Sequence, residues 1–214
     1  MTVTEFALLK LSDAYEPLEL YELLMECFEI QDTWVRKHQP ELRDPHSDAN
    51  LSSVYVDRSS TPHTLLITAQ WSSPEAHHQW VASEENQMGF AAIKKFLAEG
   101  EDSMVLFHMA PAGLRQKGAP PKFTGQGTFE VERIFIRAEE RPAVQEKYRK
   151  LEGTLLDLKI EDPIWAGWRL EKESPETDEL VVFYSQSQSP LGRTVEKLDV
   201  SHKKQVLVFE HIIG

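Results

Sequence analysis

The chain of 214 residues is short of cysteine and of positive charge. Cys27 is the only cysteine, so no intrachain disulfide and no multi-cysteine zinc site can form, which favours a reducing, cytoplasmic location. Lys and Arg number 23 against 35 Asp and Glu, for a net charge of −12. This excess of negative charge repels nucleic acid and anionic lipid. The N-terminus lacks a secretory pattern, and no run approaches the ~18 apolar residues of a membrane span.

Motifs for several common chemistries are also missing. The chain has no nucleotide-binding loop, no nucleophile elbow and no HExxH pattern. His77 and His78 are adjacent, so on a helix they point about 100° apart and cannot chelate one metal together. We interpret them as a solvated helix start, and Cys27, inside an apolar helical stripe, as a packing thiol. No metal and no cofactor is expected.

The first half of the chain predicts a strand, a long helix, a hairpin, a second helical region and a closing strand. The ranges are 5–11, 17–38, 51–57 with 63–71, 86–98 and 103–109. Ser73 and Pro74 are typical of a helix start. The apolar residues of the helix over 17–38 that are expected to face the sheet are Leu18, Tyr21, Leu24, Met25, Phe28, Ile30 and Trp34. For the helix over 86–98, the expected core residues include Met88.

The second half repeats this order. It predicts strands at 129–137, 164–170, 180–185 and 205–213, with helices at 141–158 and 189–198. The hairpin VYVDRSSTPHTLLI matches WRLEKESPETDELVVF, and the strand MVLFHM matches VLVFEH. We therefore expect an α+β protein of two ferredoxin-like βαββαβ repeats, 1–110 and 128–214, joined by a Pro/Gly-rich linker at 111–127. Each repeat has a half-exposed sheet, and the two antiparallel sheets can cover each other as a barrel.

The segment LLITAQWSSPEAHHQWVASEENQ, followed by SMVLFHM, resembles the dimeric α+β barrel superfamily, and specifically its antibiotic-biosynthesis-monooxygenase-like branch. Members pair two subunits so that their sheets form one barrel. A tandem copy resembles that dimer fused into one chain, a form common in fungi, which implies a monomer with an internal pseudo-dimer or a homodimer. The resemblance implies cofactor-independent oxygenation of polyphenols, haem breakdown, or decarboxylation, cyclisation and isomerisation of small molecules.

The haem-degrading members of that family can be compared residue by residue. Their helical Trp is matched by Trp80, but their haem-ligating His falls on Phe90. Their strand-one asparagine falls among Phe6, Ala7 and Leu8. A phenyl ring cannot ligate iron, so the resemblance argues against haem.

Candidate site residues lie mainly on strands, where one sheet face looks into the predicted barrel. His108 and its repeat equivalent Glu210 are candidates for general acid–base chemistry, and the alternative is a strand-end histidine with a solvated carboxylate. Arg169 is a third catalytic candidate that needs Glu130, Glu132 or a bound carboxylate as partner. Aromatic side chains that suit a planar phenolic ligand, or the core, are Tyr55, Trp80, Trp165, Trp168 and Tyr184.

Three functions fit these observations. The first is a cofactor-free enzyme of secondary metabolism that acts on a small aromatic or polyketide-like substrate, by acid–base cyclisation, isomerisation or decarboxylation, or by oxygenation. The second is a non-catalytic ligand-binding or stress-response protein with the same cavity. The third is a structural or regulatory protein whose barrel is filled by side chains. An enclosed volume above ~300 Å³ with a buried titratable group favours the enzyme.

Overall fold

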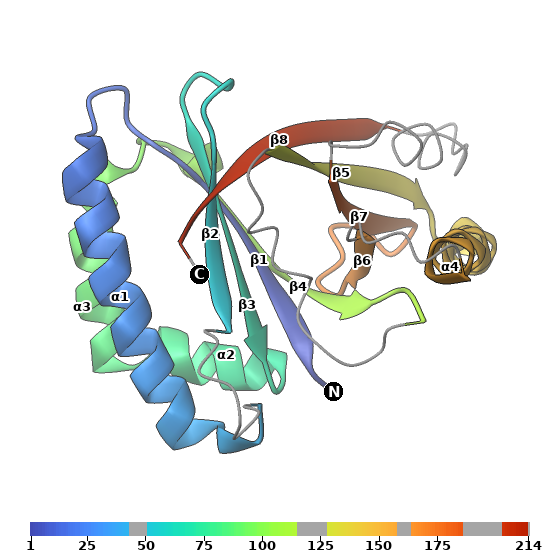
Figure 1. The fold of residues 1–214 in the computed structure, drawn as a ribbon, viewed down its shortest axis with the longest axis horizontal. Coiled ribbons are helices and arrows are strands. Elements are labelled where there is room, and N and C mark those ends of the chain that lie inside the picture. The colour runs from blue at the N-terminus through green and yellow to red at the C-terminus, as the bar shows by residue number, and fades with distance from the viewer. Residues whose placement is uncertain (43–50, 115–127, 158–163, 186–202, 214) are drawn as a thin grey trace. The chain divides into compact units, whose positions relative to one another are not determined.

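The computed structural model describes residues 1–42, 51–114, 128–157, 164–185 and 203–213. The chain divides into two compact units, residues 1–106 with 212–214 and residues 107–211. Figure 1 traces both units from the N-terminus to the C-terminus. Within the described ranges, no helix is long and apolar enough to cross a membrane.

The first unit is built on a three-stranded antiparallel sheet. Strand β3 (Thr64–Trp71) lies between β1 (Val3–Lys10) and β2 (Ser52–Asp57), and Ala69 is opposite both Glu5 and Ser52. Alternate residues of a strand point to opposite faces, so Glu5 and Leu9 share one face of β1. Three helices cover one side of this sheet: α1 (Pro17–His38), α2 (Pro74–Val81) and α3 (Glu84–Ile93) (Figure 1).

Serine side chains set the start of the two shorter helices. Ser73 Oγ accepts a hydrogen bond from the Ala76 amide, and Ser83 Oγ accepts one from the Asn86 amide, both at 3.2 Å. The predicted helix over 86–98 therefore begins at residue 84, because Ser83 caps it, and it ends as a 3₁₀ turn, Lys94–Phe96.

The face of α1 that meets the core is narrower than expected. Leu20, Leu24 and Phe28 are buried at helical spacing. Leu18 is 68 % exposed, and Tyr21 and Met25 are also exposed, so placing these three against the sheet was wrong. All three lie on one side of the buried stripe, about 60–120° from Leu24 around the helix, where the surface already turns toward solvent. Met88 on α3 is likewise exposed rather than part of the core.

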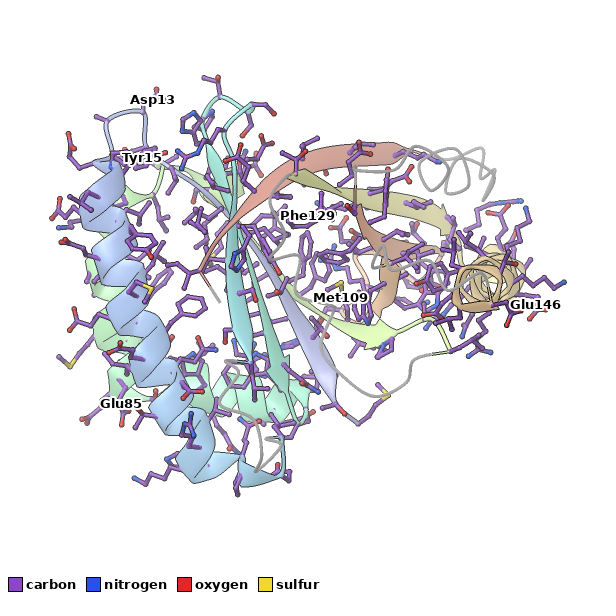
Figure 2. All side chains as sticks on the ribbon, viewed as in Figure 1. Asp13, Tyr15, Glu85, Met109, Phe129 and Glu146 are labelled. Carbon is purple, nitrogen blue, oxygen red and sulfur yellow. The ribbon has the colours of Figure 1, made fainter. Side chains whose placement is uncertain are left out.

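The second unit has a larger sheet. Strand β5 (Thr128–Arg137) lies between β8 (Lys204–Ile213) and β7 (Thr177–Ser185), β7 also pairs with β6 (Ile164–Arg169), and β6 pairs with the end of β4 (Met104–Pro111). Helix α4 (Arg141–Asp157) contributes Val144, Tyr148 and Leu151 to a core shared with these strands. Met109 and Phe129 are buried, whereas Glu146 lies on the outer face of α4 (Figure 2).

Hydrogen-bonded neighbours follow the order β1-β3-β2-β8-β5-β7-β6-β4, which is the strand connectivity of a closed antiparallel barrel. The expected α+β barrel class is confirmed. The division into repeats at 1–110 and 128–214 stays a prediction. The expected short helix at 189–198 and residues 115–127 of the expected linker lie outside the described residues.

Candidate functional site

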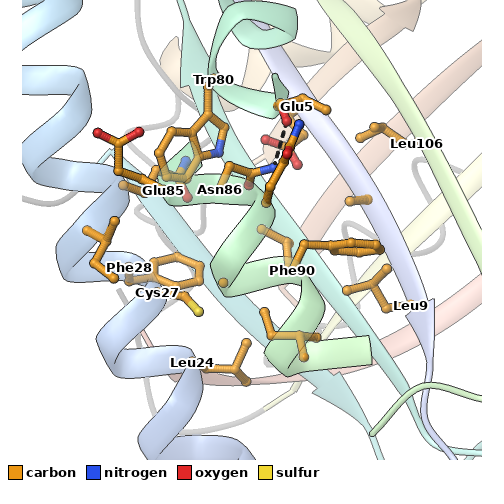
Figure 3. Close-up of a pocket in the computed structure, with 18 of the residues that line it drawn as sticks. Glu5, Leu9, Leu24, Cys27, Phe28, Trp80, Glu85, Asn86, Phe90 and Leu106 are labelled. Atoms are coloured by element: carbon orange, nitrogen blue, oxygen red, sulfur yellow. Dashed lines mark hydrogen bonds between the residues drawn. The ribbon is translucent and has the colours of Figure 1, made fainter. Parts of the chain in front are cut away.

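A cavity of about 500 Å³ lies inside the first unit, between its sheet and its three helices (Figure 3). All of its lining residues fall between Glu5 and Leu106. The volume is within the ~300–1,000 Å³ of small-molecule sites in proteins. The cavity is therefore formed by one unit alone.

Most of the cavity wall is apolar. Strand β1 contributes Ala7 and Leu9, while α1 contributes Leu24 and Phe28. Further apolar contacts come from Ile67 of β3, Phe90 and Ile93 of α3, and Met104 and Leu106 of β4. Phe90, Met104 and Leu106 are also partly exposed to solvent, so the cavity is open on that side. Its apolar wall suits an apolar, ring-containing ligand.

One end of the cavity holds a carboxylate and an imidazole that are both withdrawn from solvent. Glu5 is 8 % exposed and His77 is 2 % exposed. His77 Nε2 lies 3.4 Å from Glu5 Oε2, and the same oxygen accepts a hydrogen bond of 2.9 Å from the indole nitrogen of Trp71. Trp80 and Asn86 lie at this end as well (Figure 3).

Three elements bring this pair together. Glu5 lies on the face of β1 that points to the helices, and Trp71 is the last residue of β3. His77 lies in the first turns of α2, where the Ser73 cap fixes the start of the helix. Its ring stacks on Trp71, with centroids 4.5 Å apart and planes 19° apart. Trp71 thus positions both the carboxylate and the imidazole.

A buried carboxylate beside an imidazole can move a proton to or from a bound molecule. General acid–base catalysis needs such a group within hydrogen-bond reach of the substrate proton, and both groups line the cavity. The Asn86 side chain is held by a hydrogen bond from its nitrogen to the Val81 carbonyl at 3.2 Å. The arrangement therefore offers proton transfer at one end and apolar binding over the rest.

Cys27 also lines the cavity, on the α1 side. Burial raises the pKa of its thiol, and the nearby Glu26 carboxylate raises it further. The thiol form is the weaker nucleophile, so Cys27 acts in packing rather than in covalent chemistry. Among the described residues, no group of three His, Cys, Asp or Glu side chains could hold a metal ion.

Of the eight residues predicted for the site, Trp80 lines this cavity. His108 is buried in the second unit, where its ring Nδ1 and its backbone amide contact the Glu171 carboxylate at 2.5 and 2.8 Å. Burial works to raise the pKa of Glu171, but the hydrogen bonds from His108 outweigh it, so the pKa is lowered. Glu210 is exposed on β8. The catalytic roles of His108 and Glu210 stay predictions.

Arg169 has acidic partners other than those expected. Its guanidinium pairs with Glu173 at 2.5 Å and with Glu179 at 3.1 Å, and it lies 4.5 Å from the centre of the Phe107 ring. Arg133 shares Glu179. The expected partners are engaged elsewhere: Glu130 accepts from Tyr184, and Glu132 pairs with Lys204. Glu179 neighbours Arg169 because β6 pairs with β7 with Trp168 opposite Leu180, a register that strand parity alone did not reveal.

The other aromatic candidates are buried in packing. Trp165 contacts Phe183 edge-on, with ring centroids 5.5 Å apart. The guanidinium of Arg141 lies 4.7 Å from the centre of the Trp168 ring. Tyr55 and Tyr184 are buried on β2 and β7. Their roles as ligand contacts stay predictions.

Sequence reasoning missed Glu5 and His77. The expectation that His77 is solvated was wrong, because α2 turns this residue onto Trp71 while His78 faces outward. A signal was present on the first strand: it is apolar at both parities around Glu5, so this carboxylate had to be buried on one face of the sheet.

Comparison with known proteins supports the fold. No protein-family model and no curated protein matches the chain. Solved structures resemble it over nearly its whole length. A protein of Fusobacterium nucleatum with a provisional monooxygenase assignment has a TM-score of 0.63 at 10 % identity, covering 98 % of this chain and 92 % of that one. An anthrone oxidase-like protein has a TM-score of 0.58 at 13 % identity, covering 99 % and 91 %.

A second provisionally assigned monooxygenase, from Lactobacillus acidophilus, has a TM-score of 0.56 at 8 % identity, covering 98 % of this chain and 93 % of that one. At these identities the likeness shows a shared α+β barrel fold. It does not carry over an activity, which depends on the side chains of the site.

Proposed function

We propose that the first unit carries out a cofactor-independent, oxygenase-type reaction on a small, planar aromatic or polyketide-like molecule. The observation that carries this proposal is the buried Glu5–His77 pair at one end of an otherwise apolar cavity. The monooxygenase and oxidase-like names of the similar structures support the reaction class. Phe90, at the position that resembles the family's haem ligand, lies in the cavity wall and cannot ligate iron.

The chemistry begins with removal of a proton from an acidic C–H or O–H of the substrate by the Glu5–His77 pair. The resulting carbanion passes an electron to O₂, and the two radicals combine at carbon. For a methylene between two aromatic rings, the peroxide then loses water. The CH₂ group becomes a ketone, one oxygen atom stays on the product and the other leaves as water. The apolar wall holds the ring system in place beside the pair.

Anthrone is the probe that tests this function, because it has such a methylene group. Oxygen consumption and quinone absorbance are measured with the wild-type protein after dialysis against a chelator. H77N and E5Q are each expected to lower kcat by about 10²–10⁴-fold, the usual effect of removing a general base. H78N, which changes the adjacent exposed histidine, is the matched control. Turnover by H77N and E5Q within threefold of wild type would refute the assignment.

The predominance of apolar lining also supports a second candidate, a ligand-binding protein without turnover. Thermal unfolding separates the two. A ligand at 100 times its Kd stabilises the folded state by about 2.7 kcal/mol. A raised Tm without oxygen consumption by any phenolic probe would favour binding alone.

A further inference from the structure

We propose that Phe90 determines the length of the ring system that the cavity accepts, because its side chain stands on the side of the cavity that is open to solvent. The inference rests on the proposed function, since it specifies the size of the substrate of that same site. Phe90 lines the cavity and is 39 % exposed. Its ring therefore lies at the boundary between the cavity and solvent.

The open side of the cavity lies over the start of β4. Met104 and Leu106 share one parity on this strand, line the cavity, and are 44 % and 39 % exposed. On β1, by contrast, the lining residues Ala7 and Leu9 are buried. The helices therefore cover β1 and leave the start of β4 uncovered, so a long ligand has apolar surface to lie on beyond the covered part of the cavity.

Phe90 stands about one helical turn away from the Glu5–His77 end. Asn86, which lies at that end, precedes Phe90 by four residues on α3, or about 6 Å along the helix axis. Figure 3 shows the Phe90 ring directed from α3 toward Leu9 of β1. The first rings of a ligand bound at the Glu5–His77 end fit before Phe90, and a further ring meets its side chain.

The backbone of α3 is held on both sides of Phe90. Gly89 lies against α1, where an added Cβ would be 3.1 Å from the Sγ of Cys27. Ile93 is buried in the core cluster that includes Phe28 of α1. Because these contacts fix the helix, removal of the Phe90 ring opens space in the cavity and does not let α3 close over it.

The space freed by F90A is that of one six-membered ring, so this change should admit one more ring of ligand. Burial of a further phenyl ring strengthens binding by about tenfold or more. Two ligands isolate this effect: 2-naphthol and 6-phenyl-2-naphthol have the same hydroxyl end and differ by one ring.

Fluorescence titration under nitrogen, where no oxygenation can occur, measures the two Kd values. Wild type is expected to bind the two ligands within about threefold of each other, because the added ring meets Phe90 and gains little burial. F90A is expected to bind 6-phenyl-2-naphthol about tenfold or more tightly than 2-naphthol, and F90W to bind it about tenfold more weakly. M88A, at a 76 % exposed position of the same helix outside the lining, is the matched control and should keep the wild-type ratio.

The wild-type ratio decides the matter even if F90A does not fold. Wild-type binding of 6-phenyl-2-naphthol about tenfold tighter than 2-naphthol would overturn the inference, because the added ring would already have room. An unchanged ratio in F90A that is folded by circular dichroism would also overturn it. Anthrone oxidation in air is measured separately. Turnover with an unchanged F90A ratio would remove this inference and leave the proposed function, whereas the length limit without turnover would do the reverse.

Discussion

Helices α1 and α3 approach each other closely beside the cavity, at Cys27 and Gly89. A Cβ atom placed on Gly89 would lie 4.0 Å from the Cβ of Cys27 and 3.1 Å from its Sγ. Disulfides join Cβ atoms about 3.5–4.5 Å apart. G89C is therefore expected to form a disulfide with Cys27 that links the two helices.

The size of the effect follows from the length of chain between the two positions. Closing a loop of about 60 residues removes enough entropy from the unfolded chain to stabilise the protein by about 4 kcal/mol, as an upper value. For a chain of this size each kcal/mol raises Tm by about 2–4 °C. Engineered disulfides give less than this ideal, so a rise in Tm of about 5 °C is expected.

Free-thiol titration and thermal unfolding measure this outcome. Oxidised glutathione is added because the raised pKa of Cys27 leaves little thiolate to react. The Tm gain should disappear with dithiothreitol. G89S, with a side chain of similar size and no thiol, should show no reducing-agent effect. Two free thiols in oxidised G89C would show that α1 and α3 do not approach as described.

Three further outcomes are expected. The pKa of Glu171 is lowered, so its pairing with His108 stabilises the fold above pH about 4.5, and this stabilisation is lost as the pH falls through the pKa of the folded state. In urea unfolding series at several pH values, E171Q should show a smaller drop in the free energy of unfolding over this acidic range. Cys27 should react slowly with iodoacetamide at pH 7.5 and faster at higher pH, by mass spectrometry. E179Q should lower the free energy of unfolding in urea by about 3–5 kcal/mol, because it leaves two guanidinium groups without their shared carboxylate. E173Q, at a 67 % exposed position, should lower it by under about 1 kcal/mol.

The elements were largely predictable because their signals are local. Pro17 marks the start of α1 and Ser73 with Pro74 marks that of α2, as expected. Alternating apolar residues identified β3. The face of α1 was less predictable, since choosing among Leu18, Leu20 and Tyr21 depends on how the helix rotates against the sheet, which is a tertiary effect.

The candidate site was harder to predict because its residues come from three elements far apart in the chain. Glu5 and His77 are 72 positions apart; they contact each other directly, and Trp71 donates to the carboxylate and stacks on the imidazole. Neither residue lies in a motif. The prediction also placed the site on the barrel-facing side of the strands, whereas the described cavity lies on the helix-facing side.

Helix α3 borders the cavity and contributes little to the hydrophobic core. Of its ten residues, Ile93 is the one that is buried, while Asn86 and Phe90 border the cavity. Substitutions along its inner face would therefore change the shape of the cavity at small cost in folding free energy, since little buried contact is lost. Such a helix is a natural place for variation in what the protein accepts, both in evolution and in engineering.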